Sequence, residues 1–338
     1  MYLRSTSGYP IEDSYTEMAL LITLFLIAFS HQWSFMTKRK DLCELQDDFS
    51  SLTVKSSTLS GNGRARVWHY HESKAVKKAR LSCILTVIHW LVTILSLHLG
   101  YWIQKLEVVT SELKPILAVT NIFSIIFWSF LMSSFLPGFI LCAQMSCNLM
   151  KSTEEIFLDD VRTGVKLRNT VRFSKEAEKT SKLLSPIYLH LSLCAFVPLT
   201  LRIYQLLDFG LIGSSSPHVL IYVGIVTDII GNGLGTNWIL NIQSEDMKQK
   251  FKDVKKEIHQ LVTSPSGIHV EINGNDYPEE DARKIVLKML DEFHGFDANG
   301  FFILGKPFLV NFLKTAVISY GLLFMEFHFN HLVFLSNR

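Results

Sequence analysis

The stretch that decides the fold is KTAVISYGLLFMEFHFNHLVF, residues 314–334, because it joins a long apolar run to a specific polar pattern. About 20 apolar residues in a helix are enough to cross the hydrocarbon core of a bilayer. Within this run, Ser319, Tyr320 and Glu326 interrupt the apolar sequence. The stretch therefore predicts a membrane-spanning helix that does more than anchor the chain.

The whole chain has the composition of a polytopic membrane protein. Its 338 residues are 48% hydrophobic and include 24 Phe, and its mean hydropathy is +0.24. These values are too apolar for one soluble domain, and the apolar residues come in blocks of span length. We predict an all-α membrane helix bundle with six spans, at about 18–35, 81–102, 116–142, 183–206, 219–240 and 312–334.

The basic residues predict how these spans are oriented. Of the 33 Lys and Arg residues, 28 lie in three long connections, residues 36–80, 143–182 and 241–314. Basic residues beside spans tend to stay on the cytoplasmic side. We therefore expect the three connections to be cytoplasmic and both termini to be extracellular. The small net charge of +2 gives no indication of a nucleic-acid partner.

An apolar period of about 3.6 residues continues past the predicted spans, which indicates that the spans extend as amphipathic helices. We expect these extensions to pack together in a cytoplasmic anchor, and residues 263–278 to form a flexible loop because they are rich in Ser, Gly, Asn and Pro. The predicted organisation is a transmembrane bundle over 1–242, an anchor segment over 243–311, and a last helix with its tail over 312–338. The apolar stripes are Met247, Phe251, Val254, Ile258 and Leu261; Ile156, Val161 and Val165; and Ile285, Met289 and Phe293.

One face of the last span has the character of a pore lining. Tyr320, Leu323 and Phe327 lie at steps of three and four residues, so they share a helical face. Several copies of that face around an axis would form an apolar constriction, and a ring of Glu326 carboxylates would favour cations. The plainer alternative is that the aromatic side chains only pack and that Glu326 lies near the lipid headgroups.

Asp228 is the acidic residue that stands out, because it lies about nine residues into the fifth predicted span. At 1.5 Å per residue this is a depth of about 13 Å. A carboxylate at that depth is a functional candidate and needs a partner, for which Arg202 in the preceding span is suited. The alternative is a protonated Asp228 that only bonds neighbouring helices.

Three aromatic residues, Trp90, Tyr101 and Tyr204, are further candidates for a small-molecule pocket. Such residues more often form an interfacial belt or pack against other helices. Gly231 and Gly235 lie inside an apolar span, where this spacing favours close helix packing or a bend over phosphate binding.

Two stretches resemble the arthropod gustatory receptors, a family of membrane chemoreceptors. The family ends its last helix with Thr-Tyr, five apolar residues and Gln-Phe, and the corresponding residues here are Ser319-Tyr320, GLLFM and Glu326-Phe327. The preceding stretch FDANGFF, residues 296–302, also resembles the family. The chain departs from the pattern at Ser319 and Glu326.

The resemblance implies a seven-helix receptor whose N-terminus is cytoplasmic, so we expect this chain to begin at the equivalent of the second helix. It also implies a tetramer held together by the anchor, with a short cytoplasmic helix at about 299–309 before the pore helix. Gly300, Phe301 and Phe302 then form an anchor motif. In the last helix, the resemblance makes Leu323 and Phe327 gate candidates, places Ser319 and Tyr320 in the pore motif, and makes Glu326 a candidate for ion selectivity.

The function predicted from these features is a plasma-membrane chemosensory receptor that acts as a ligand-gated, non-selective cation channel for a small-molecule tastant or odorant. Its partners would be the stimulus, cations, the lipid bilayer and other subunits of a homo- or hetero-tetramer. A G-protein-coupled receptor and a solute transporter with a midplane site at Asp228 are the alternatives. The sequence contains no nucleophile paired with a base and no credible metal-binding cluster, so we expect no enzyme activity, cofactor or metal.

Overall fold

The computed structural model describes residues 11–58, 114–153, 162–210, 216–261 and 274–315. Within the first helix, side chains are described for residues 22–45. The remaining described residues are 84–85, 87–97, 99–100, 102–103, 156–157, 269–272, 318, 321–322 and 325.

The described residues are almost entirely helical, which confirms the all-α prediction. The elements are α2 (Ile11–Thr58), α4 (Lys114–Ser133), α5 (Leu136–Ser152), α6 (Thr163–Gly210), α7 (Ser216–Asp228), the π-helix η2 (Ile229–Thr236), α8 (Asn237–Gln260), β1 (His269–Ile272), β2 (Asn275–Pro278) and α9 (Glu279–Glu292). Residues 87–97 and 306–315 are also helical.

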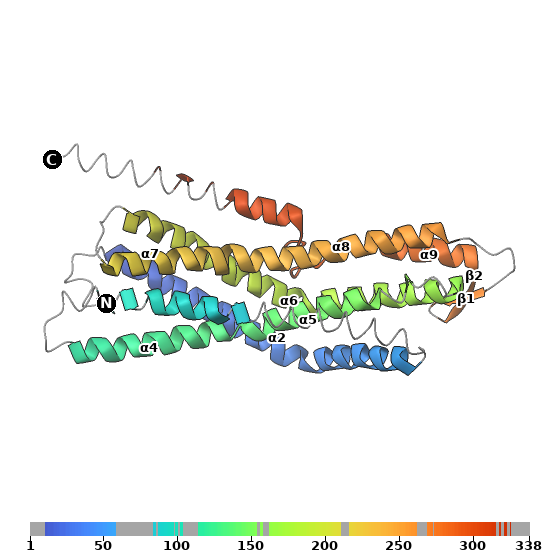
Figure 1. The fold of residues 1–338 in the computed structure, drawn as a ribbon, viewed down its shortest axis with the longest axis horizontal. Coiled ribbons are helices and arrows are strands. Elements are labelled where there is room, and N and C mark those ends of the chain that lie inside the picture. Colours follow the sequence, from blue (N-terminus) through green and yellow to red (C-terminus); the bar gives the residue numbers. More distant parts are fainter. Residues whose placement is uncertain are drawn as a thin grey trace.

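The long helices run along the long axis of the molecule (Figure 1). The strands β1 and β2, helix α9, the ends of α5 and α8 and the start of α6 gather at one end, which we call the anchor end. The start of α4, the end of α6 and the start of α7 lie at the opposite end. The start of α6 and the end of α8, which belong to two of the three basic connections, therefore lie at the same end.

The prediction that spans continue as helices outside the membrane is confirmed. Helix α6 alone has 48 residues, about 72 Å at 1.5 Å per residue, whereas the hydrocarbon core is about 30 Å thick. In the same way, α7, η2 and α8 follow one another without a break from Ser216 to Gln260. The predicted span 116–142 is wrong as one helix: a turn at Ser134 and Phe135 divides it into α4 and α5. Pro137 explains the break, because proline lacks an N–H and disfavours helix in the residue before it.

Large apolar side chains cover the outside of the bundle away from the anchor end. Phe29, Phe123 and Phe130 are 59, 65 and 70% exposed, and many Ile, Leu and Val side chains are similarly exposed. A surface this apolar is matched by lipid or by a protein partner. By length and composition, one described stretch, Val219–Gln260, is able to cross a membrane, and Val87–Leu97 and Leu136–Met150 are shorter apolar helices.

The anchor has a core that the sequence predicted closely for α8. Met247, Phe251, Val254 and Ile258 are buried as expected, and Leu261 packs partly buried against them. Phe251 stacks on Phe293 with ring centroids 4.0 Å apart. A buried ion pair adds a polar connection between α6 and α8, in which Lys166 Nζ lies 2.8 Å from Glu257 Oε1.

Other parts of the anchor differ from the prediction. On α9 the most buried line is Ala282, Val286 and Leu290, while the expected stripe of Ile285, Met289 and Phe293 is only partly buried. In the earlier connection Ile156 is buried but Val165 is 43% exposed, so the latter prediction is wrong. Val161 lies outside the described residues.

The predicted loop at 263–278 contains a short β-hairpin. Strands β1 and β2 pair antiparallel, with Val270 opposite Tyr277. Val270 and Ile272 are each only 2% exposed, because alternate side chains of β1 point into the anchor core. The prediction of a flexible loop is therefore wrong for residues 269–272 and 275–278, because these two apolar residues of β1 fix the hairpin to the core.

Candidate functional site

The clearest polar site within the predicted spans is an ion pair between α6 and α7. Arg202 Nε donates a hydrogen bond to Asp228 Oδ2 over 2.8 Å. The two side chains are 11 and 2% exposed, so the pair is inside the bundle and not at its lipid-facing surface. The expectation that Arg202 partners Asp228 is confirmed. A carboxylate in this position is stabilised by the opposite charge that it faces.

A histidine from the neighbouring helix 87–97 adjoins this pair. Asp228 lies within electrostatic range of His89. The His89 ring packs directly on the backbone of Gly231, where an added Cβ would overlap the ring. Among the described residues, His89 Nε2 is buried without a hydrogen-bond partner. The predicted close packing at Gly231 is therefore confirmed, and its partner is an imidazole.

The helix changes its winding immediately after Asp228. Residues Ile229–Thr236, with the sequence IIGNGLGT, form the π-helix η2 between α7 and α8. A π-turn is rare and places one extra residue in the turn, which loosens packing along the helix. Three glycines, which carry no Cβ, lie within this wide turn, and the bend that the sequence offered as the alternative to close packing stays a prediction.

The remaining pocket candidates are not brought together by the described residues. Trp90 is partly buried and packs against the main core cluster, as the packing alternative expected. Tyr101 and the side chain of Tyr204 lie outside the described residues. A ligand pocket among Asp228, Trp90, Tyr101 and Tyr204 stays a prediction.

The motif FDANGFF forms a tight β-hairpin, so the expected helix at 299–309 is wrong. Asn299 and Gly300 both have positive φ, 55° and 77°, and the N–H of Phe301 donates to the carbonyl of Ala298 over 3.1 Å. Positive φ at both central residues is the requirement of a type I′ turn, and Asn-Gly is its preferred sequence. An isolated bridge between Asp297 and Ile303 closes the hairpin, and helix resumes only at residue 306.

The three residues of the expected anchor motif have different surroundings. The Gly300 N–H donates to both carboxylate oxygens of Asp297, at 2.9 and 3.1 Å. Phe302 stacks on Phe308 with ring centroids 4.1 Å apart. Phe301 is 74% exposed at the tip of the hairpin. Thus Gly300 shapes the turn and Phe302 packs, while Phe301 presents its ring outward.

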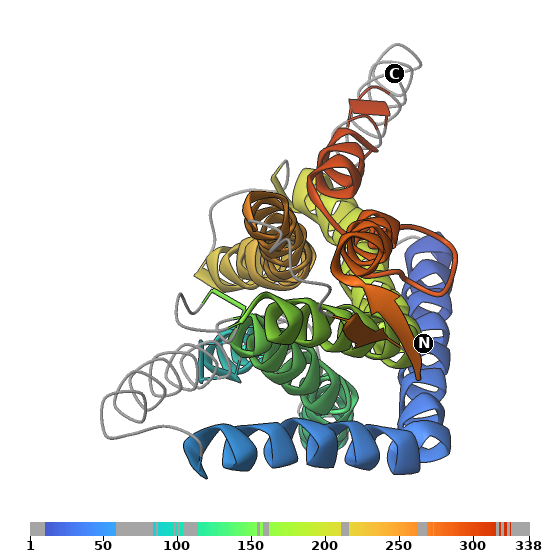
Figure 2. The same ribbon diagram turned by 90° about the vertical axis from the view of Figure 1, so that its right-hand side faces the viewer.

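The last helix leaves the bundle soon after it begins. Near its start, Phe312 is buried and its ring lies 5.4 Å from that of Phe196 on α6. Beyond this contact the helix projects away from the other helices (Figure 2). Val310, Ile318, Leu322 and Met325 are 47, 61, 58 and 61% exposed. The pore and gate candidates Ser319, Tyr320, Leu323, Glu326 and Phe327 lie outside the described residues.

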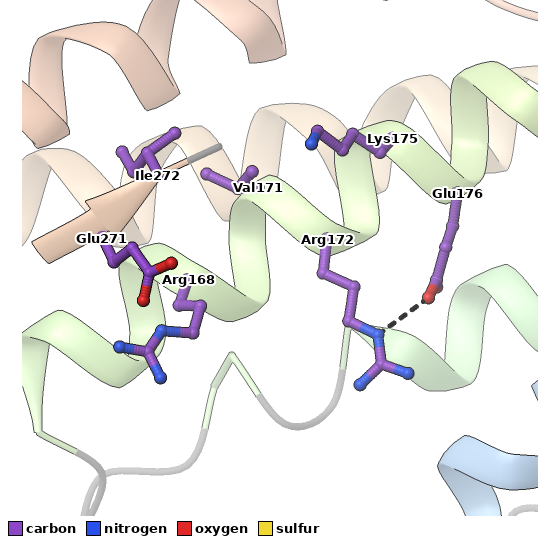
Figure 3. A pocket seen from close by; sticks show the side chains of 7 residues that line it. All are labelled: Arg168, Val171, Arg172, Lys175, Glu176, Glu271 and Ile272. Carbon is purple, nitrogen blue, oxygen red and sulfur yellow. Dashed lines mark hydrogen bonds and ion pairs between the residues drawn. The ribbon is translucent and has the colours of Figure 1, made fainter. Parts of the chain in front are cut away.

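A hollow of about 380 Å³ opens at the anchor end, between α6 and β1. Arg168, Arg172, Lys175 and Glu176 from α6 and Glu271 from β1 line it with both signs of charge (Figure 3). Arg172 Nε donates to Glu176 Oε1 over 3.0 Å. Because three basic and two acidic side chains line this hollow, their charges largely offset one another, and we assign it no binding role.

Sequence reasoning missed a set of polar residues that hold residues 296–306 in place. These are Ser181 and Ser185 on α6 and Asn241, Ser244 and Glu245 on α8, and each bonds a backbone N–H of the segment 296–306. The Asn299-Gly300 dipeptide was the available signal for the hairpin itself. No local pattern marks its long-range partners.

Comparisons with known proteins place the fold. No protein-family model matches the chain, and no curated protein matches it in sequence. A structure of the insect olfactory receptor OR5 from Machilis hrabei in complex with eugenol is similar, with a TM-score of 0.64 and 13% identity over 90% of this chain and 80% of that chain. A structure of OR5 from the same insect gives a TM-score of 0.65 and 13% identity, over 94 and 82% of the two chains. The chain therefore has the polytopic, all-helical fold of an insect-type chemoreceptor.

Proposed function

We propose that this protein is a chemosensory receptor of the plasma membrane that acts as a ligand-gated cation channel, assembled from four copies or from related subunits. Small-molecule binding is supported by the fold, since the receptor that shares it has been solved with eugenol. For such a mechanism, the stimulus must bind the open state more tightly than the closed state. Recording the responses to a panel of tastants and odorants distinguishes the two kinds of stimulus.

The observation that carries this proposal is the isolation of the last helix. It contacts its own bundle near its start, then stands apart with apolar side chains exposed (Figure 2). A lone apolar helix beside a bundle gains packing when copies associate around an axis. That arrangement would give the predicted face of Tyr320, Leu323 and Phe327 a common conduit.

The ion pair argues against the transporter alternative. In this structure Asp228 already faces the positive charge of Arg202 over 2.8 Å. A midplane carboxylate that binds a transported cation must be free to exchange its partner. We therefore propose that the pair holds α6 and α7 together and that it is not a transport site.

The proposal is tested by expressing the full chain, with a C-terminal tag, in cells that lack chemoreceptors. We expect the tag to be labelled on intact cells, subunit counting by photobleaching to give four steps, and eugenol or another compound of the panel to evoke a cation current without a G-protein. A monomer, or a tag accessible only after permeabilisation, would overturn the proposal.

Replacing Glu326 by Gln should change ion selectivity. If four Glu326 carboxylates border the conduit, their loss lowers the local concentration of divalent cations. We expect the permeability ratio of Ca²⁺ to Na⁺ to fall by about threefold or more, a size set by the loss of a ring of charges, measured as a shift in reversal potential. Glu326→Asp keeps the charge and is the control. The same reversal potential in Glu326→Gln and in the native channel would remove Glu326 from the conduit.

A further inference from the structure

Residues 293–305, which we call the junction loop, connect α9 to the last helix and are seated firmly in the molecule. Phe296, Ala298 and Leu304 are completely buried. Phe296 stacks on Tyr188 of α6 with ring centroids 5.2 Å apart. Phe293 at the start of the loop stacks on Phe251 of α8. The loop therefore packs between the two long helices α6 and α8 and is not a flexible linker.

Serine hydroxyls of α6 bind the hairpin arm of the junction loop. Ser185 Oγ donates to Asp297 Oδ2 over 3.1 Å and accepts from the Asn299 N–H over 2.5 Å. Ser181 Oγ accepts from the Asp297 N–H over 3.3 Å. The same Asp297 carboxylate accepts from Gly300, so one carboxylate joins α6 to the turn.

Side chains of α8 bind the end of the loop and the first residue of the last helix. Ser244 Oγ donates to the Leu304 carbonyl over 2.7 Å and accepts from the Phe296 N–H over 3.2 Å. Asn241 Oδ1 accepts from the Gly305 N–H over 2.7 Å. Glu245 Oε2 accepts from the Lys306 N–H over 3.3 Å. These acceptors satisfy N–H groups that a helix leaves unpaired at its N-terminus, and the carboxylate suits the positive end of the helix dipole.

The loop thus has one side bonded to α6 and its exit bonded to α8. The helices that it joins also carry the Arg202–Asp228 pair and η2, because α8 is continuous with η2 and α7. A shift of α6 against α8 changes the distance between the two sets of bonds. Packed elements adopt discrete arrangements and do not deform continuously. Such a shift therefore moves the start of the last helix, because the tightly packed loop does not deform enough to take it up.

We propose that the junction loop is the coupling element of the receptor, in which Ser185, Asn241 and Ser244 position the last helix according to the relative placement of α6 and α8. This inference rests on the proposed channel function for its physiological meaning. It also makes a structural claim that does not depend on current. The loss of a hydrogen bond at the α6 side of the loop weakens the hydrogen bonds at its α8 side.

The test compares hydrogen exchange in Ser185→Ala and Ser244→Ala with exchange in the unmodified receptor. The control is Ser192→Ala, because Ser192 is also a buried serine of α6 but its hydroxyl has no partner among the described residues. Removing the Ser185 hydroxyl removes the acceptor of the Asn299 N–H and one donor to Asp297 Oδ2, which should speed amide exchange about tenfold. We expect this acceleration at residues 297–300 and also at 304–309, and in neither region for Ser192→Ala. Acceleration confined to 297–300 would overturn the coupling role.

Currents recorded from the same variants, in symmetrical Na⁺ with and without eugenol, distinguish this inference from the proposed function. We expect the current per receptor at the cell surface to fall at least about fivefold in Ser185→Ala and Ser244→Ala, as the loss of about one hydrogen bond permits, and to be unchanged in Ser192→Ala. Native-sized currents in all three variants would overturn the coupling role. If the unmodified receptor carries no current, but Ser185→Ala still speeds amide exchange at residues 304–309, the channel function is contradicted and the coupling role is supported.

Discussion

Replacing Asp228 by Asn should destabilise the receptor more than replacing both members of the ion pair. The substitution would leave the Arg202 guanidinium, which cannot lose its charge, facing a neutral amide inside the bundle. Breaking a buried pair by removing one partner costs about 3–5 kcal/mol, whereas replacing both partners by neutral groups is often close to neutral. Arg202→Met should be milder than Asp228→Asn, because a lone carboxyl group is able to take up a proton.

The measurement is thermal denaturation of the detergent-solubilised receptor, followed by size-exclusion chromatography of a fluorescent fusion. Asp291→Asn is the matched control, since Asp291 pairs with Lys255 over 2.5 Å at the surface and the two side chains are 60 and 36% exposed. An exposed pair of this kind contributes about 0–1 kcal/mol. If Asp228→Asn behaves like Asp291→Asn, the buried pair does not stabilise the bundle.

This ion pair is the part of the site that sequence predicted best, for a physical reason. Inside the fourth and fifth predicted spans there is one basic residue, Arg202, and one acidic residue, Asp228. Uncompensated charge inside a bundle is so costly that two such residues are expected to meet. No comparable constraint applies to Trp90 or Tyr204, because an aromatic ring packs acceptably on many surfaces.

The anchor shows where periodicity is sufficient and where it is ambiguous. On α8 from Met247 to Ile258, polar residues separate the apolar ones, so only one face is able to be buried, and that face is the observed one. On α9, Ile285 and Val286 are adjacent and apolar, as are Met289 and Leu290. Two lines one residue apart then fit the same period, and only tertiary packing selects Val286 and Leu290 as the buried line.

The junction loop shows what local sequence does not contain. Its turn was encoded in Asn299-Gly300, but the resemblance to the gustatory receptors favoured a helix there. Its partners, Ser185 and Ser244, lie 112 and 60 residues from the atoms that they contact, Asp297 Oδ2 and the Leu304 carbonyl. A serine in a helix commonly bonds its own backbone, so nothing in its local sequence distinguishes a serine that binds a distant loop.

Replacing Gly231 by Ala should destabilise the receptor, although alanine is normally the better helix former by about 1 kcal/mol. The added Cβ would overlap the Cε1 and Nε2 atoms of His89, which requires the ring or η2 to move. Overpacking of this kind costs about 1–3 kcal/mol. Gly321→Ala is the control, because Gly321 is also helical and an added Cβ there meets no atom of the described residues within 4 Å.

The cause of this effect is tested by the second variant, His89→Ala, alone and combined with Gly231→Ala. Removing the ring removes the clash, so Gly231→Ala should cost much less in the His89→Ala background than in the native one. We expect a coupling of about 1–3 kcal/mol between the two sites, which is the range for residues in direct contact, measured from the melting temperatures of all four proteins. Additive effects would mean that Gly231 is required by the π-helix η2 itself and not by the imidazole packed against it.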